Sequence, residues 1–488
     1  MTTYETSDAA PGLERRVRSG AIWSAANSLG MKVGNIAIMV VVVRLVTPAE
    51  FGVFAAALTI AVILGSFADW GVSSFLIRSE ADLEEVAPTV AFIAIASGAV
   101  LSTATFVAAP LLADAFAAPE AVGPIRVMAL CLVLGSFAAV PSAILAREFR
   151  QDKIFLANVI GFVPANAVLL VLAFEGVGAM AFAWSRVVAV VFQGIAVCVA
   201  VARWYRPRLD RERLRQVLAF GLPLAGANLV NYTLLNADYA FVGHAMGPAL
   251  LGIYVLAFSI ASWSTSMLAA AINGVAMPAF SRVGNDRARL EAALHRSTRA
   301  VSLIALPMAT LTLALAGPLV VTLYGTAWQA AVPVLEILGA YGAIFVLVSL
   351  LSNLLVGLGH TGRVLLIQLA WIAALIPAML VGVHVDGVAG VAWAHVLVVA
   401  AVVLPLYVWT VSRETPRVVQ LLAGAALPPL AACVAAFAVA VGVKSLLDVP
   451  FQQLLLGGAA GGVTYLLCSA SMLRDFAGSR RTHGEVDA

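Results

Sequence analysis

Long apolar stretches alternate with short polar gaps along almost the whole chain. Each stretch has about the 20 residues that a helix needs to cross the hydrocarbon core of a bilayer. The apolar runs are unbroken and lack the two-residue alternation of barrel strands, so the pattern predicts membrane-spanning helices and excludes a β-barrel. We expect spans at residues 20–43, 50–77, 87–109, 125–146, 154–174, 177–202, 217–243, 249–277, 299–316, 331–357, 363–383, 387–411, 419–443 and 451–473.

Basic residues fall into alternate gaps between these stretches. Of the 29 Lys and Arg residues, 24 lie in the gaps at 1–19, 78–86, 147–153, 203–216, 279–299, 360–363, 412–418 and 474–488. Loops rich in Lys and Arg stay in the cytoplasm. The sequence therefore predicts an all-α integral membrane protein with 14 transmembrane helices and both termini in the cytoplasm.

Composition agrees with this prediction and narrows the chemistry. Hydrophobic residues make up 62% of the chain and charged residues 11%, whereas a soluble domain has about 25% charged residues. The net charge of +3 follows from the loop pattern and requires no nucleic-acid partner. The six His residues show no metal-ligand spacing, so we expect neither a metal nor a cofactor.

The chain also repeats itself at an offset of about 200 residues. Residues 20–27 recur at 221–228, and Pro48–Phe54 recurs as Pro248–Tyr254. The repeat therefore predicts two pseudo-symmetric six-helix lobes and a C-terminal helix pair. Both lobes begin inside the cell, and substrate sites in such repeats lie between the halves, near the midplane. The predicted segments are an N-terminal tail (1–19), the N-lobe (20–202), a basic cytoplasmic linker (203–216), the C-lobe (217–411), the thirteenth and fourteenth spans (412–473) and a C-terminal tail (474–488).

Two equivalent helices of the repeat, the first and seventh spans, carry polar side chains along one face. Polar groups in hydrocarbon must face protein or a water-filled cavity. We expect these faces to meet across a hydrated central cavity; interhelical hydrogen bonding is the alternative for any single asparagine. Arg186, in the sixth span, is a further cation within the membrane. The substrate-binding candidates are therefore Asn27, Lys32, Asn35, Asn228, Asn231, Asn236 and Arg186.

The charged residues within the spans have distinct expected roles. Lys32 could hold an anionic phosphate, whereas Arg186 could instead reach the membrane interface or pair locally. Asp238 and Asp69 are the candidates for coupling transport to an ion. Asp69 lies close to the cytoplasmic end of its span, where it could serve only to cap that end.

Several short motifs, in order along the chain, resemble those of a known transporter family. The motifs are Arg44–Phe54, Phe67–Gly71, Gly252–Tyr254, Met277–Arg282 and Leu323–Trp328. Together they resemble the polysaccharide transporter branch of the multidrug/oligosaccharidyl-lipid/polysaccharide exporter superfamily, over residues 15–410. The cavity residues vary within this family, so the site residues named above rest on this sequence alone.

The resemblance implies a V-shaped, two-lobe flippase that works by alternating access. Such proteins carry undecaprenyl-diphosphate-linked oligosaccharide across the bacterial cytoplasmic (inner) membrane for assembly of lipopolysaccharide O-antigen, capsule or exopolysaccharide. The expected partners are this lipid-linked oligosaccharide, membrane lipids and polymerase or glycosyltransferase proteins. We expect a multi-pass monomer that is not an enzyme.

Two alternatives remain open at this stage. A cation-coupled drug or metabolite antiporter of the same superfamily would favour an acidic cavity, but the buried cations and carboxylates roughly balance here. A membrane polysaccharide polymerase or ligase would carry catalytic residues on a large outside loop. The longest outside gaps, 110–124 and 317–330, are short and contain no Lys, Arg or His.

Overall fold

All regular elements described in the computed structural model are helices. The structure describes residues 23, 27, 30–68, 71–78, 82–201, 203, 205–271 and 286–474. The tail at 1–19, the candidate residue Asp69 and the residues from 475 onwards lie outside the described residues. The described chain falls into two compact units, Met1–Gly252 and Ile253–Ala488, and each is considered by itself.

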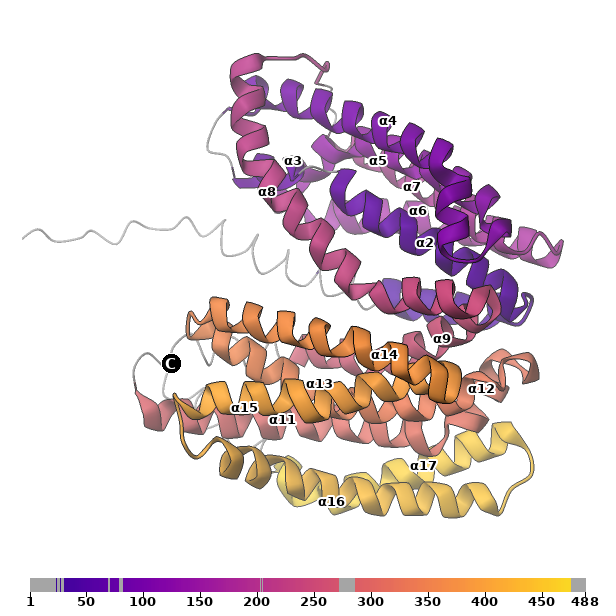
Figure 1. Ribbon diagram of the computed structural model, residues 1–488, viewed down its shortest axis with the longest axis vertical. Helices are drawn as coiled ribbons and strands as arrows, with labels where there is room; N and C mark the ends of the chain where they lie inside the picture. Colours follow the sequence, from indigo (N-terminus) through magenta and orange to yellow (C-terminus); the bar gives the residue numbers. More distant parts are fainter. Residues whose placement is uncertain are drawn as a thin grey trace, which may run out of the picture. The chain divides into compact units, whose positions relative to one another are not determined.

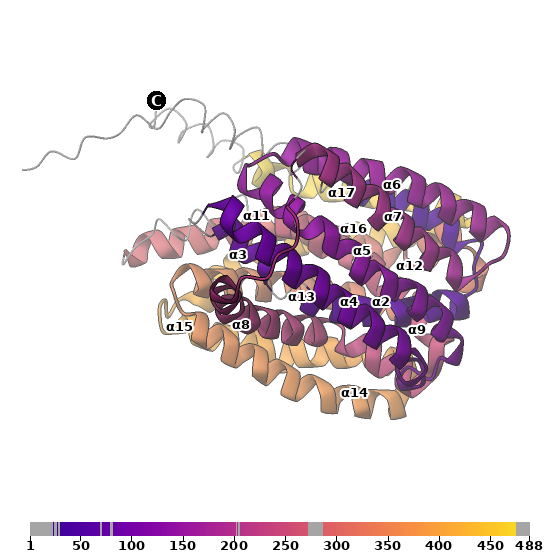
Figure 2. The ribbon, with the colours of Figure 1, turned by 90° about the horizontal axis from the view of Figure 1, so that it is seen from above.

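The first unit is a bundle of helices (Figure 1). Its elements are a first helix, Gly30–Val43, followed by α2 (Pro48–Ala68), α3 (Val72–Arg78), α4 (Leu83–Ala115), η1 (Pro119–Ala121), α5 (Val122–Arg147), α6 (Gln151–Phe174), α7 (Ala179–Val201), α8 (Arg211–Leu235) and the beginning of α9 (Ala237–Ala271). α5 packs between α4 and α7, and α6 packs along α7. Figure 2 shows α6 and α7 lying side by side in the second view.

Short polar side chains fix where the helices of this unit begin. At the start of α2, the Glu50 carboxylate accepts hydrogen bonds from the Thr47 backbone N–H (2.8 Å) and hydroxyl (2.9 Å). The Glu50 backbone N–H in turn donates to Thr47 Oγ1 at 3.3 Å. This reciprocal arrangement is a capping box, and Pro48 suits the first helical turn. The turn predicted before Pro48 is therefore the capped start of α2.

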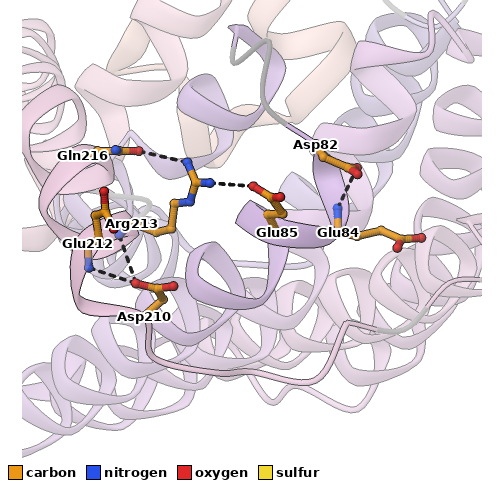
Figure 3. Close-up of polar contacts among 7 residues, drawn as sticks. All are labelled: Asp82, Glu84, Glu85, Asp210, Glu212, Arg213 and Gln216. Carbon is orange, nitrogen blue, oxygen red and sulfur yellow. Dashed lines mark hydrogen bonds and ion pairs between the residues drawn. The ribbon is translucent and has the colours of Figure 1, made fainter.

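The start of α8, within the expected basic linker, is held against α4 (Figure 3). Asp210 Oδ1 accepts from the backbone N–H groups of Glu212 (2.9 Å) and Arg213 (3.3 Å), which caps α8. The Arg213 guanidinium pairs with Glu85 in the first turn of α4 at 2.5 Å. α8 consequently begins at Arg211, earlier than the expected start at 217. An exposed pair of this kind adds at most about 1 kcal/mol, so the cap and the apolar packing of α8 determine its position.

The helix expected over the span 217–243 is interrupted at Asn236. α8 ends at Leu235 and α9 starts at Ala237. Asn236 Nδ2 donates to the Tyr232 carbonyl oxygen at 2.7 Å, so the asparagine satisfies the backbone at the break. A second break within α9 lies at Gly247, where φ is 78°. This second break falls at the turn expected before Pro248.

The second unit is also a helical bundle. Its described elements are the rest of α9, α11 (Arg287–Ala314), α12 (Ala316–Tyr324), η3 (Thr326–Trp328), α13 (Ala331–Gly357), α14 (Thr361–Val398), the π-helix η4 (Val399–Val403), α15 (Leu404–Ser412), α16 (Val418–Ser445) and α17 (Pro450–Cys468). α11 and α13 contribute most of its largest apolar core, with Leu350, Leu351 and Leu354 fully buried. α16 and α17, yellow in Figure 1, pack against each other as the expected C-terminal helix pair.

The second unit contains the turn expected at Asp386-Gly387. The helical run of α14 is interrupted at these two residues, where Gly387 has a φ of 55°. A left-handed backbone of this kind favours glycine. The run Thr361–Ser412 therefore contains two helical segments joined by a tight turn, at the place where the sequence predicts a turn.

Length and hydropathy make ten helices of the described chain able to cross a membrane, and Gly30–Val43 is a shorter apolar helix. Many large apolar side chains on them are exposed, such as Val107 and Leu111 of α4. Exposed apolar surface on long apolar helices is the surface that lipid covers. The chain is a multi-pass membrane protein, and the number of 14 spans stays a prediction.

Candidate functional site

A polar cavity of about 250 Å³ opens within the first unit, between the first helix, α2, α6 and α7. Apolar and aromatic side chains form much of its wall. Its polar lining residues among the described ones are Asn35, Asn158, Asn166, Ser185, Arg186 and Gln193. Polar side chains within membrane helices are costly unless they serve one another or a hydrated ligand. Their convergence on one cavity makes this the candidate site.

Close helix packing at Gly161 brings α6 and α7 together beside the cavity. A Cβ atom at this position would lie 2.9 Å from the Ala189 carbonyl oxygen and from the Gln193 Cβ. Only glycine allows this approach without displacing α7. The close contact lets polar side chains of the two helices meet one turn further along.

A hydrogen-bonded chain of amides connects α7, α6 and residue 27 at this point. Gln193 Nε2 of α7 donates to Asn158 Oδ1 of α6 at 2.7 Å. Asn158 Nδ2 in turn donates to Asn27 Oδ1, on the segment before the first helix, at 3.1 Å. Each amide retains further donor or acceptor capacity beyond these bonds. These two bonds fix the orientation of Asn158, because its Nδ2 and Oδ1 atoms are both hydrogen-bonded. Gln193 and Asn27 lie at the two ends of this chain of amides.

Two further asparagines present amide groups to the cavity. Asn35 Nδ2 donates to the Met31 carbonyl oxygen and Asn166 Nδ2 to the Phe162 carbonyl oxygen, each at 2.8 Å and one turn back in the same helix. These bonds hold the side chains in one rotamer. A second N–H and the Oδ1 atom of each amide remain as ligand-binding groups.

Arg186 supplies the charge of the cavity. The residue lies about 10 Å along α7 from its first residue, by the rise per residue of an α-helix, and so well inside the membrane-spanning segment. Its side chain is exposed, whereas the neighbouring Ser185 is buried in the wall. A guanidinium stays charged at any physiological pH. Among the described residues that line the cavity, Arg186 is the one with an ionisable side chain.

Stacked aromatic rings form the apolar side of the cavity. The Phe54 ring of α2 and the Phe182 ring of α7 lie 4.4 Å apart between centroids, with an interplanar angle of 18°. Both line the cavity, as does Phe162 of α6. The site thus combines flat apolar faces, several amides and one permanent cation.

The structure brings together some of the predicted site residues and leaves others apart. Asn35 and Arg186 line the cavity, and Asn27 belongs to the amide chain beside it. Lys32 is half-buried in the first helix without being a lining residue.

The candidates of the seventh span do not share one continuous helix. Asn228 and Asn231 lie in α8, Asn236 lies at the break, and Asp238 is buried in the first turn of α9, with 5% of its surface exposed. Their predicted common arc assumed an unbroken helix, so it does not extend past Asn236.

Asn158, Asn166 and Gln193 were missed by reasoning from the sequence. A signal was present: Arg186 and Gln193 are seven residues apart and therefore share one helix face. The polar-stripe argument applied to the first and seventh spans would have found them if it had been applied to the fifth and sixth. No group of three metal-ligating side chains occurs among the residues that the structure places.

Comparison with known proteins gives a family match. A family model described as "Polysaccharide biosynthesis protein" matches residues 41–333. The succinoglycan biosynthesis transport protein ExoT of Rhizobium meliloti (strain 1021) is 28% identical over 471 residues, which cover 93% of each chain. The lipopolysaccharide biosynthesis protein WzxC of Escherichia coli (strain K12) is 23% identical over 397 residues, 79% of each chain.

A solved structure shares the fold. The lipid II flippase MurJ in an inward closed conformation superposes with a TM-score of 0.72 at 13% identity, covering 93% of this chain and 100% of that one. At this identity the likeness concerns the fold alone. It agrees with an all-helical membrane protein.

Proposed function

The chain belongs to the polysaccharide biosynthesis protein family, and on this premise we propose that it is a flippase for lipid-linked oligosaccharide. It carries polyprenyl-diphosphate-linked sugar units across the bacterial cytoplasmic membrane for assembly of a cell-surface polysaccharide. The match to a succinoglycan transport protein over 93% of both chains supports this function. The observation that carries it is the polar, positively charged cavity inside a unit built from membrane-spanning helices.

The physical need for such a cavity follows from the substrate. A diphosphate and its sugars cannot cross hydrocarbon unaided, because a charge at the bilayer centre costs several kcal/mol or more. Amides and a guanidinium inside the helical bundle replace part of the water that the headgroup loses. The polyprenyl tail can stay in lipid while the headgroup passes through protein.

We propose that transport proceeds by alternating access between two lobes, residues 20–202 and 217–411, with the pair 412–473 beside them. In this proposal the chain has 14 spans, both termini are cytoplasmic, the lipid is undecaprenyl diphosphate and the protein acts as a monomer. Polymerase and glycosyltransferase proteins are the proposed partners, since they would consume and supply the substrate.

The proposed roles of the site residues follow their chemistry. Asn27 and Asn35, with Asn228, Asn231 and Asn236, bind sugar hydroxyl groups; Lys32 and Arg186 bind anionic oxygens. Asp238 or Asp69 couples the cycle to a proton or cation. The position of Asn35 and Arg186 at the cavity supports this assignment for the first unit.

The alternatives are less well supported. A cavity that serves a cationic drug should carry a carboxylate, whereas the lining described here carries Arg186. A polymerase or ligase would be an enzyme, while the relative that matches over 93% of both chains has the name of a transport protein.

Deletion of the gene in its host tests the proposed function. We expect surface polysaccharide to disappear and full-length lipid-linked units to accumulate on the cytoplasmic side, as measured by mass spectrometry of lipid extracts from right-side-out and inverted vesicles. Re-expression should reverse both effects. Accumulation of truncated units, or of complete units already on the outer face, would instead indicate an enzyme of assembly or polymerisation.

A further inference from the structure

The cavity of the first unit has a marked charge asymmetry. Its described lining has one guanidinium, from Arg186, and no carboxylate. No hydrogen bond or ion pair is formed by Arg186 with another residue in the described part of the chain. A permanent cation within a membrane-spanning helix is stabilised by a nearby anion or by water. The geometry leaves this place open to a ligand.

The size of the cavity limits that ligand. A volume of about 250 Å³ lies just below the roughly 300–1,000 Å³ of pockets that hold drug-sized ligands. One sugar ring or one phosphate group fits such a space. Any larger substrate must place a single unit here.

The remaining lining suits a sugar unit rather than a bare ion. The stacked rings of Phe54 and Phe182 offer a flat apolar surface, against which the C–H face of a pyranose can pack. Asn35 and Asn166 offer amide donors and acceptors at the side, which match hydroxyl groups. An inorganic cation would instead require several oxygen ligands, carboxylates above all.

We propose that this cavity is a subsite for one acidic sugar unit, a sugar phosphate or a uronate, whose anionic oxygens pair with Arg186. The proposal deepens the proposed function and rests on it for the biological source of the ligand. The Asn158–Gln193 pair orients the wall beside Arg186, so that the amides meet the hydroxyl groups while the guanidinium meets the charge.

Binding to the purified full-length protein in detergent tests the subsite. The probes are glucose 1-phosphate, glucuronate, inorganic phosphate and uncharged glucose, each titrated by calorimetry. Because a hydrogen bond to a charged group contributes about 1.5–3 kcal/mol, we expect a charged sugar to bind about tenfold or more tightly than glucose. The phosphate and uronate probes distinguish the two sources of negative charge.

Variants assign the binding to the cavity. Arg186→Gln should weaken binding of the charged sugar about tenfold or more, and Arg186→Lys should weaken it less. Arg126→Gln is the matched control, since Arg126 lies in α5 over the Phe106 ring and does not line the cavity. Should Arg186→Gln fail to fold, Gln193→Glu, which adds a negative charge to the same wall, should produce the same loss.

The outcomes separate the subsite from the proposed function. Equal binding of glucose and both charged sugars, or undiminished binding by Arg186→Gln and Gln193→Glu, would overturn the subsite. Inorganic phosphate that binds as tightly as glucose 1-phosphate would overturn its selectivity for a sugar. Neither result depends on flipping, which the gene deletion tests by itself.

Discussion

Gly52 and Gly252, at equivalent positions of the internal repeat, each pack against the helix start of the other. A Cβ atom at Gly52 would lie 1.7 Å from the Pro248 carbonyl oxygen, and one at Gly252 would lie 2.0 Å from the Pro48 carbonyl oxygen. The contact is reciprocal, as expected for two copies related by a twofold axis. The repeat seen in the sequence is thus expressed as a symmetric backbone contact inside the first unit.

This contact predicts a strict requirement for glycine. Gly52→Ala and Gly252→Ala should each destabilise the protein by about 3 kcal/mol or more, because the clash is with backbone and not with a side chain that can rotate. Thermal unfolding of the purified variants measures the effect.

Gly442→Ala in α16 is the matched control for the two glycine variants. A Cβ there meets nothing within 4 Å, so the change should be neutral or stabilising by up to about 1 kcal/mol. Equal melting temperatures for Gly52→Ala and Gly442→Ala would contradict the close approach of the two helices.

The amide chain beside the cavity should matter more for transport than for stability. Asn158→Ala removes the bonds to Asn27 and Gln193, and interhelical hydrogen bonds in membranes contribute about 0.6 kcal/mol each. We expect a loss of about 1 kcal/mol in the free energy of unfolding, together with a large loss of glycan export. Asn353→Ala, which removes a bond within one helix to Ser349, should leave export intact. An export loss of the same size in both variants would argue against a special role for the chain.

Lys32 should be required for export although it does not line the cavity. Lys32→Ala should abolish glycan export while membrane insertion stays normal, since loss of a charge from a spanning helix lowers the cost of insertion. Surface polysaccharide and the amount of protein in membranes measure the two effects.

Lys444→Ala provides the comparison for Lys32. The Lys444 ammonium donates to the Ala314 carbonyl oxygen in the second unit, at 3.3 Å, and its loss should leave export unchanged. Normal export by Lys32→Ala would remove Lys32 from the proposed substrate path.

Asp238 should carry the ion dependence of transport. Its carboxyl group is buried in the first turn of α9, where a helix N-terminus favours negative charge. Asp238→Asn should lower export and remove its response to collapse of the proton or sodium gradient. Asp114→Asn, at an exposed position near the end of α4, should behave as the unmodified protein does. If Asp238→Asn kept both the rate and the gradient response, coupling would have to lie elsewhere.

The proposed topology predicts which loops face outward. Starting from a variant that lacks the four native cysteines, Glu120→Cys and Asp448→Cys should react with a membrane-impermeant maleimide added to whole cells. Leu209→Cys should react only after the membrane is opened. All three positions are exposed in the structure. Labelling of position 209 in intact cells would show that the orientation is opposite to the one that the basic residues predict.

Local chemistry explains which parts of the fold were predictable from the sequence. The breaks before Pro248 and at Asp386-Gly387 were predicted because proline restricts φ, and glycine permits a positive φ, at those residues themselves. The break at Asn236 has no proline or glycine and was not foreseen. Asn236 bonds the carbonyl oxygen four residues back, as Asn35 and Asn166 also do within helices that continue, so an asparagine alone does not predict a break.

The same reasoning explains the partial success at the site. Asn35 and Arg186 were identified because an amide or a cation inside an apolar helix is costly wherever the helix packs. Asn158 and Gln193 are amides in the same setting, but their bond to each other depends on the close approach of α6 and α7 at Gly161. A partnership between two helices appears in the structure and not in either helix alone.

The small volume of the cavity has a consequence for glycan engineering. A cavity with room for one sugar contacts only one sugar of a repeat unit. Chemical differences at the other sugars should therefore not affect binding in this cavity. Strains that express foreign glycosyltransferases should still display hybrid polymers on their surface, provided that the sugar bound in the cavity is unchanged.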